Sequence, residues 1–251
     1  MISIMIPTMS APLLDMTLKS IKRNLVCNPQ VLVFDNTDGK QGIEELVAGH
    51  SNSCYMAEHR NIGIPRAYAA LYEAAEHNII FTADDDYYYL PGWDTELIDH
   101  MERDDRTKEL YSRAPVMIEH LGGNPWTICQ DFGTSISNFR EEDVLKAEFN
   151  MQEKPNPHCP VAVTKHTWER LGGWDTDYFP GFGADPDFLH RLYIQSGKQR
   201  DCLLNAPGSY YYHFSGSTSG ALFSHVPRSE SHEMFARKNG STIKSFVQEL
   251  S

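Results

Sequence analysis

Short apolar runs alternate with segments of helical periodicity along the first third of the chain. Residues 2–6 are apolar apart from Ser3, and the run ends at Pro7. Ser10, a residue type that caps helices, then precedes apolar positions that recur at helical spacing over 14–25. A second apolar run at 31–34 closes in a cluster of Asp, Asn and Gly that favours a turn. This pattern predicts a strand, a helix and a second buried strand.

The next unit repeats the pattern and ends in a run of acidic residues. Pro65 suits the first turn of a helix whose apolar positions extend over 67–75, and residues 79–81 have the pattern of a strand. Strands that alternate with amphipathic helices form parallel sheets, and ligands bind beyond the carboxyl ends of such strands. The sequence therefore predicts an α/β fold with a mostly parallel central sheet flanked by helices.

The second half of the chain has a less regular pattern. Strands are expected over 116–118, 161–163 and 209–214, a helix over 185–195, and a helical C-terminal tail over 230–250. The 251 residues can bury one sizeable core, and their sequence contains neither a linker-like stretch nor an internal repeat. We therefore expect a single domain over residues 1–251.

Net charge restricts the partners of this chain. The formal charge of −12 repels the phosphate backbone of nucleic acids, so nucleic-acid binding is not expected. A phosphate-bearing small molecule remains compatible with this charge, because a bound divalent cation can reverse the local field.

Cysteine usage and hydropathy indicate the compartment. The five cysteines are scattered and form no C-x-x-C pair, which favours neither a zinc site nor a disulfide framework. No segment approaches the ~20 apolar residues that a membrane span requires. We expect a cytoplasmic protein without an integral membrane segment, whose contact with a membrane, if any, would be peripheral.

Three consecutive aspartates, Asp84, Asp85 and Asp86, follow the predicted strand at 79–81. Like charges a few ångströms apart repel one another, so a bound cation would relieve them. Carboxylate oxygens suit Mn²⁺ or Mg²⁺, which keep coordination positions open for substrate phosphates. The tripeptide alone is equally compatible with a solvated acidic turn or with the N-cap of a helix.

Several separated segments resemble, in order, the motifs of glycosyltransferase family 2, the inverting enzymes of GT-A fold that use nucleotide-activated sugars. The segments are Ser3-Ile4-Met5-Ile6-Pro7-Thr8, Val31-Leu32-Val33-Phe34-Asp35-Asn36-Thr37, Asn61-Ile62-Gly63, Thr82-Ala83-Asp84-Asp85-Asp86, Leu171-Gly172-Gly173-Trp174-Asp175, Gly183-Ala184-Asp185-Pro186-Asp187 with Arg191, and Tyr212-His213-Phe214-Ser215-Gly216-Ser217. They cover about the first hundred residues and another sixty later on, and leave 101–157 and the tail unmatched.

The resemblance implies a donor site and a metal site. Asp35 would read the nucleotide base, and Asp84, Asp86 and His213 would hold Mn²⁺ or Mg²⁺. Residues expected to contact the donor are Pro7, Thr8, Asp35, Asn61, Gly63, Arg66, Asp84 and Asp85. Asp35 also suits a simple turn, and Arg66 also suits a solvent-facing helix position.

The resemblance further implies a catalytic base, for which Asp185 and Asp187 are both candidates. Asp185 falls on the position of the base, but the family's preceding glutamate is Ala184 here, which keeps Asp187 as a rival. An Asp before Pro at a helix start is also an ordinary cap. Trp174, close in sequence to Asp185, is expected to line the acceptor site, since aromatic rings stack on sugars.

The implied activity is transfer of a sugar from a nucleoside-diphosphate sugar, with UDP-sugars favoured, to a hydroxyl of a glycan or another acceptor. Residues 1–100 would form the donor half, 101–225 the acceptor and catalytic half, and 226–251 the helical tail. A sugar nucleotidyltransferase is disfavoured, because the loop 7–12 contains neither glycine nor a basic residue. A non-catalytic sugar-nucleotide or glycan-binding protein and a glycosyltransferase acting on a modified DNA base remain alternatives.

Overall fold

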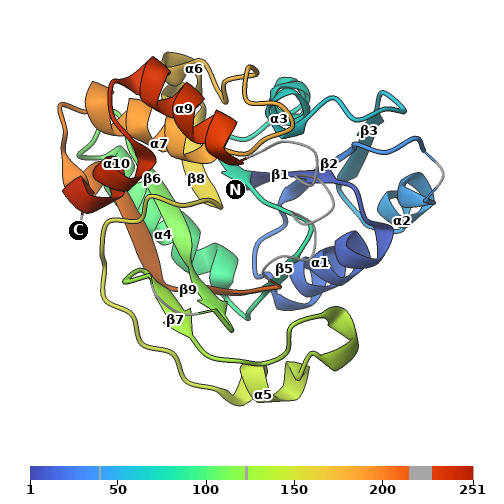
Figure 1. Ribbon diagram of the computed structural model, residues 1–251. Helices are drawn as coiled ribbons and strands as arrows, with labels where there is room; N and C mark the ends of the chain where they lie inside the picture. The colour runs from blue at the N-terminus through green and yellow to red at the C-terminus, as the bar shows by residue number, and fades with distance from the viewer. Residues whose placement is uncertain (40, 122–123, 215–227, 251) are drawn as a thin grey trace.

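The computed structural model describes residues 1–39, 41–121, 124–214 and 228–250, and has helices on both faces of one central sheet (Figure 1). The strands are β1 (Ile2–Thr8), β2 (Gln30–Asp35), β3 (Ser53–Ala57), β4 (Ile79–Thr82), β5 (Tyr87–Tyr89), β6 (Ser112–Glu119), β7 (Thr127–Cys129), β8 (Val161–Thr164) and β9 (Leu203–His213). The helices are α1 (Ala11–Asn24), α2 (Ile43–Ala48), α3 (Ile64–Glu73), α4 (Trp93–Asp105), α5 (Glu141–Lys146), α6 (Lys165–Leu171), α7 (Ala184–Gln195), α9 (Arg228–Asn239) and α10 (Ile243–Leu250). No described helix is long and apolar enough to cross a membrane.

The sheet has the order β3-β2-β1-β4-β8-β6-β9-β5, with β7 paired to β6. The first four of these strands run parallel, as do the pairs of β6 with β9 and β7. The pairs β4–β8, β6–β8 and β5–β9 are antiparallel. The prediction of a mostly parallel α/β sheet is therefore confirmed, with a reversal of direction in its second half.

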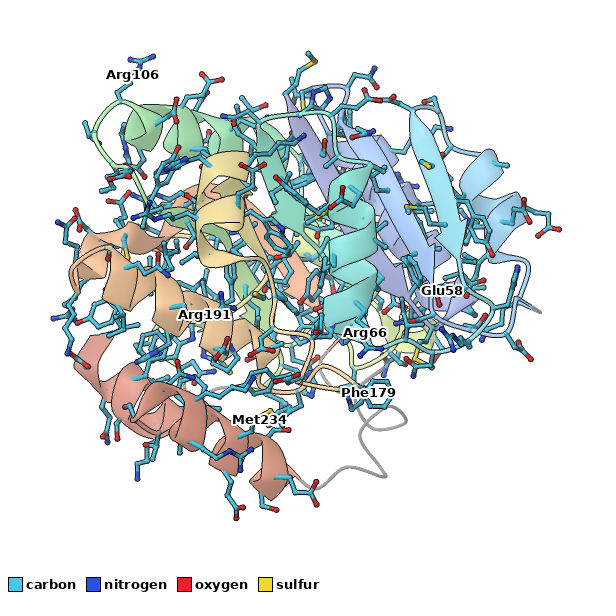
Figure 2. All side chains as sticks on the ribbon, turned by 90° about the horizontal axis from the view of Figure 1, so that it is seen from above. Glu58, Arg66, Arg106, Phe179, Arg191 and Met234 are labelled. Atoms are coloured by element: carbon cyan, nitrogen blue, oxygen red, sulfur yellow. The ribbon has the colours of Figure 1, made fainter. Side chains whose placement is uncertain are left out.

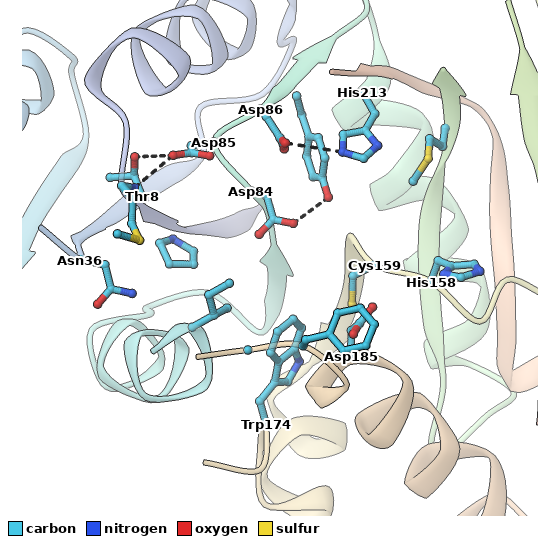
Figure 3. Close-up of a pocket in the computed structure, with 17 residues that line it drawn as sticks. Thr8, Asn36, Asp84, Asp85, Asp86, His158, Cys159, Trp174, Asp185 and His213 are labelled. Carbon is cyan, nitrogen blue, oxygen red and sulfur yellow. Dashed lines mark hydrogen bonds and ion pairs between the residues drawn. The ribbon is translucent and has the colours of Figure 1, made fainter. Parts of the chain in front are cut away.

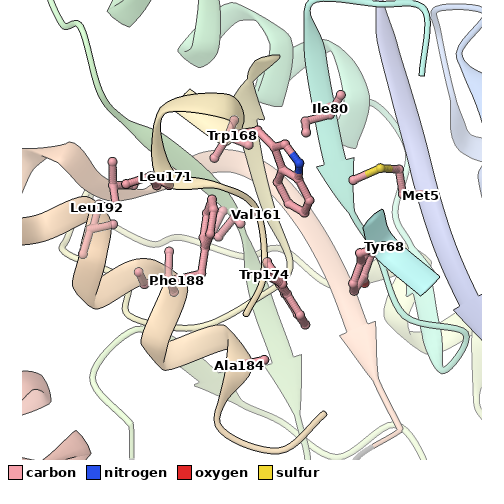
Figure 4. Packing of buried hydrophobic residues seen from close by; sticks show 14 of the residues in the cluster. Met5, Tyr68, Ile80, Val161, Trp168, Leu171, Trp174, Ala184, Phe188 and Leu192 are labelled. Atoms are coloured by element: carbon pink, nitrogen blue, oxygen red, sulfur yellow. The ribbon is translucent and has the colours of Figure 1, made fainter. Parts of the chain in front are cut away.

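Side chains that alternate along β1 enter two separate apolar layers. Ile4 and Ile6 pack with α1, α2 and α4 on one face of the sheet. Met5 points to the opposite face, where α3, α6 and α7 cover it together with the tail helices. Figure 4 shows this second layer, in which Trp168 and Phe188 lie among the buried apolar side chains. Burial on both faces explains why the strand is a continuous apolar run.

Most of the expected elements are confirmed, with shifts at their ends. Ser10 caps α1 by accepting a hydrogen bond from the backbone N–H of Leu13. The helix expected through residue 75 ends at Glu73, and the strand expected from 209 begins at Leu203. The tail is two helices, since Gly240 takes a left-handed backbone angle between them. The elements β3, β5, β7, α2, α5 and α6 were not predicted.

Candidate active site

A cavity of about 340 Å³ lies beyond the carboxyl ends of β1 and β4, where the pattern of parallel strands predicts a ligand site. Eight of the residues singled out in the sequence line it: Pro7, Thr8, Asp84, Asp85, Asp86, Trp174, Asp185 and His213. Five others do not line it: Asp35, Asn61, Gly63, Arg66 and Asp187. Segments separated by more than two hundred positions in the sequence thus line the same cavity (Figure 3).

Asp84 and Asp85 are held by hydroxyl groups from two different elements, β5 and β1. The Tyr87 hydroxyl donates to Asp84 Oδ2 at 2.7 Å, and the Thr8 hydroxyl donates to Asp85 Oδ2 at 2.6 Å. Burial, with the charge of Asp86 added, raises the pKa of Asp84 to about 6. The same two causes raise the pKa of Asp85. The turn therefore concentrates more negative charge than its neighbours neutralise, which a cation would relieve.

His213 lies between two carboxylates. Its Nε2 is 3.6 Å from Asp86 Oδ2, and its Nδ1 is 3.6 Å from Glu119 Oε2. Burial opposes the charge on the ring, but Asp86 and Glu119 together raise the pKa of His213 to about 10. The pairing of β5 with β9 sets this geometry, because it places Tyr87 opposite His213. Glu119 was missed in the sequence, although it directly follows the strand predicted over 116–118.

The donor set suits a divalent cation such as Mn²⁺ or Mg²⁺. Carboxylate oxygens from Asp84 and Asp86 and an imidazole nitrogen from His213 are ligand types that these ions accept. Within the described parts of the chain, no three His, Cys, Asp or Glu side chains already form a ready group of metal ligands. The raised pKa of Asp84 is the observation that favours added positive charge at this turn.

Asp185 lies in the first turn of α7 and faces the cavity. Burial, reinforced by the charge of Asp84, raises its pKa to about 7. A carboxyl group of this kind exchanges its proton near neutral pH, which is the property required of a general base. Asp185 is therefore placed where a bound acceptor could lose a proton.

Asp187 lies two residues further along α7 and does not line the cavity. Its side chain is engaged in hydrogen bonds. Its carboxylate accepts hydrogen bonds from Arg191 Nε at 2.8 Å, from Asn239 Nδ2 at 2.8 Å and from the Tyr178 hydroxyl at 3.3 Å. Because these groups join α7 to α9 and to the preceding loop, Asp187 acts as a structural anchor. Of the two candidates for the base, Asp185 lines the cavity and Asp187 does not.

The expected base-reading residue, Asp35, is buried at the end of β2 rather than exposed in the cavity. It accepts hydrogen bonds from the Thr37 backbone N–H at 2.8 Å and from the Tyr55 hydroxyl at 3.0 Å. Its neighbour Asn36, which we did not single out, lines the cavity instead. Asn36 Oδ1 also accepts from the Ile62 backbone N–H at 3.0 Å, and so ties the cavity edge to the next loop.

That loop leads into α3 and packs against the segment 179–181. Asn61 Oδ1 accepts a hydrogen bond from Gly63 N–H at 2.8 Å, and Ile64 N–H donates to the Pro180 carbonyl at 2.7 Å. Arg66 is exposed in the first turn of α3, on the same side of the molecule as Phe179 (Figure 2). Ile64 lines the cavity, whereas Asn61, Gly63 and Arg66 do not.

Aromatic and apolar groups line the end of the cavity near Asp185. Trp174 packs on Tyr68 with ring centroids 4.5 Å apart, and His158 packs on Trp126 at 5.1 Å. Burial lowers the pKa of His158 to about 4, and burial raises the pKa of the Cys159 thiol. His158 is therefore neutral and Cys159 is not a thiolate at neutral pH. Ser215, Gly216 and Ser217 of the last motif lie outside the described residues.

The fold agrees with comparisons to known proteins. Residues 3–122 match the model of the family described as glycosyl transferase family 2. A search of curated proteins finds no match. Among solved structures, S. aureus TarS residues 1–349 share 15% identity with a TM-score of 0.61, over 99% of this chain and 69% of that chain.

Two further structures are similar over the same extent of this chain. GalNAc-T7 with UDP, GalNAc and Mn²⁺ shows 13% identity and a TM-score of 0.62, over 99% of this chain and 56% of that chain. The mannosyltransferase PcManGT from Pyrobaculum calidifontis, in complex with GDP-Man and Mn²⁺, shows 16% identity and a TM-score of 0.61, over 99% and 67% of the two chains. The likeness to these structures defines a GT-A fold.

The fold and the matched domain define the class of this protein, which is a glycosyltransferase. Its match to the model of glycosyl transferase family 2 spans residues 3–122, a little under half of the chain, and its fold is GT-A.

Proposed function

We propose that the protein is a metal-dependent, inverting glycosyltransferase that moves a sugar from a nucleoside-diphosphate sugar to a hydroxyl acceptor. The observation that carries the proposal is the single cavity that joins Asp84, Asp86 and His213 to Asp185. In this proposal residues 1–100 hold the donor, and 101–225 supply the base and the acceptor site. UDP-sugars are the first donors to test, although the similar structures contain UDP in one case and GDP-Man in another.

Asp84, Asp86 and His213 would hold Mn²⁺ or Mg²⁺. When bound, the cation supplies charge neutralisation for the leaving diphosphate. His213 must then offer an unprotonated Nε2, with its remaining proton on Nδ1. Glu119, at 3.6 Å from Nδ1, is placed to accept that proton's hydrogen bond and so to orient the ring.

Asp185 would take the proton of the acceptor hydroxyl as its oxygen attacks the anomeric carbon. The new bond forms between that oxygen and the carbon while the bond from the carbon to the diphosphate oxygen breaks. Attack from the face opposite the leaving diphosphate inverts the configuration. General-base assistance of this kind contributes typically ~10²- to 10⁴-fold to a rate.

The proposal is tested by release of nucleoside diphosphate from a panel of UDP-, GDP- and TDP-sugars, with Mn²⁺ or with EDTA. We expect metal-dependent release that is lost in Asp86→Ala and Asp185→Asn. Asp99→Asn, an exposed change on α4 away from the cavity, serves as the matched control and should retain activity. Donor binding without release, even with acceptor glycans present, would refute turnover and favour a sugar-nucleotide-binding protein.

A further inference from the structure

The cavity has two chemically different ends. Thr8 and Asn36 lie on one side of the three aspartates, and His158 and Cys159 lie on the other (Figure 3). The first end follows the strands β1 and β2. The second end, which contains Asp185 and Trp174, is called the acceptor end below, and this assignment rests on the proposed function.

Charge at the acceptor end is negative or absent. Asp185 supplies a carboxylate, and Glu119 lies behind His213. His158 stays neutral because burial lowers its pKa to about 4. Neither Lys nor Arg lines any part of the cavity among the residues that the structure describes.

The remaining surface of the acceptor end is apolar or aromatic. Met117, Cys159, Trp174 and Phe182 contribute to the lining, and Trp126 supports the ring of His158. The C–H face of a sugar ring stacks well on surfaces of this kind, because it is the least polar face of a polyhydroxylated molecule.

We propose that the acceptor end binds an uncharged sugar and rejects sugars that carry a carboxylate or a phosphate at the bound unit. An anionic acceptor would bring a charge beside Asp185, and the one cationic side chain of the described lining, His213, already lies between the carboxylates of Asp86 and Glu119. Repulsion between like charges lowers the affinity for an anionic sugar, and burying its charge without a partner lowers the affinity further. The lining itself therefore excludes anionic sugars. A neutral sugar meets stacking surfaces and gives its hydroxyl proton to Asp185.

The test compares acceptors that differ only in charge. Aryl glucoside and aryl glucuronide form one matched pair, and aryl galactoside and its 6-phosphate form another. With the donor found by diphosphate release, we expect kcat/KM for the neutral member to exceed that for the acidic member by at least 100-fold. Equal or better use of the acidic member would overturn the proposal.

A second arm separates this proposal from the transfer reaction itself. Saturation-transfer NMR with the same pairs reports binding without turnover, in the presence of Mn²⁺ and nucleoside diphosphate. Binding of the neutral sugars alone supports the proposal even if no donor is cleaved. Binding of neither member, or of the acidic members, overturns it while leaving donor cleavage to be judged separately.

Installing a cation should weaken the selectivity. In Met117→Lys or His158→Lys we expect the preference for the neutral acceptor to fall at least tenfold. Met117→Gln and His158→Gln are the size-matched neutral controls and should keep the wild-type preference. Two positions are used so that, if one Lys variant fails to fold, the other still tests the proposal. An unchanged preference in a folded Lys variant counts against the proposal.

Discussion

Glu119 and Asp86 flank the two nitrogens of His213, and the two carboxylates have different tasks in the proposed metal site. Glu119 is not part of the cavity lining but lies beside His213 Nδ1, so we expect it to act on a bound cation through the imidazole ring. Carboxylates that orient a metal-binding histidine typically contribute ~10- to 100-fold to metal affinity. We expect Glu119→Gln to weaken Mn²⁺ binding by that factor, measured from the EPR signal of free Mn²⁺. The exposed change Glu142→Gln should have no effect, and an unchanged Kd in Glu119→Gln would exclude the orienting role.

Asp185 should give the reaction a dependence on pH. Because burial raises its pKa to about 7, the fraction of active carboxylate falls about tenfold for each pH unit below that value. We expect kcat/KM at saturating Mn²⁺ to rise with pH and to level off above the pKa. A bound cation that neutralises Asp84 would lower the pKa of Asp185, and the rise in kcat/KM would then occur at lower pH. A flat profile between pH 5 and 8.5 would contradict the assignment of Asp185 as the base.

Substitution of Asn for each of the two candidate bases should change the stability of the fold in opposite directions. The folded-state pKa of Asp185 lies above the unfolded value of 3.8, so stability falls as pH rises through 3.8 to about 7. Asp185→Asn removes that loss, and we expect a Tm higher by roughly 2–4 °C at pH 8 for each ~1 kcal/mol recovered.

Asp187→Asn should instead lower the Tm. It removes the charge that pairs with Arg191 in a mostly buried setting, at a cost of roughly 1–3 kcal/mol. Thermal unfolding of both variants at pH 8, followed by circular dichroism, makes the comparison. A stabilising Asp187→Asn would show that the contacts with Arg191 and Asn239 do not anchor α7.

The entrance to α3 and the segment 179–181 form one packed unit at the rim. Gly63 has φ of +84°, and a Cβ there would lie 2.9 Å from Phe179 Cδ2 and 3.3 Å from the Pro180 carbonyl oxygen. We expect Gly63→Ala to displace this segment, and with it the adjoining Gly181 and Phe182 of the cavity lining, so that KM for the donor rises and Tm falls.

Gly172→Ala is the comparison for that change. Gly172 also has a positive φ, at +76°, but nothing lies within 4 Å of its added Cβ. Gly172→Ala should be destabilised by about 1 kcal/mol, because alanine is unfavourable at a positive φ. KM for the donor should stay close to the wild-type value. An equal rise in KM for both variants would mean that backbone strain, and not contact with Phe179, is responsible.

Across the molecule, metal binding should be coupled to folding stability. The unfolded chain separates Asp84 and Asp86 from His213, so a cation that binds all three favours the folded state. At 100 times its Kd, Mn²⁺ should add ~2.7 kcal/mol, or roughly 5–10 °C in Tm for a chain of this size. Asp86→Ala should abolish this increase and Asp99→Asn should keep it. A similar increase in Asp86→Ala would place the cation elsewhere.

Local pattern was sufficient to predict the framework of the donor half. The strands β1, β2 and β4 are short apolar runs because both of their faces are buried, and their ends carry Thr8, Asp84 and Asp85 to one edge of the sheet. The ligand position followed from the direction of the strands, since parallel strands end at the same edge. These features depend on residues near one another in the chain, where sequence pattern is informative.

Contacts between distant segments were decided by the tertiary structure. The pairing of β5 with β9 brings His213 beside Asp86, and β6 brings Glu119 to its other nitrogen. Asn239, in the tail, fixes Asp187 as an anchor. No local periodicity encodes such pairings, because they depend on how whole elements pack. The strand ends and the acidic turn could therefore be anticipated, whereas the partners and charge of each side chain depended on the folded chain.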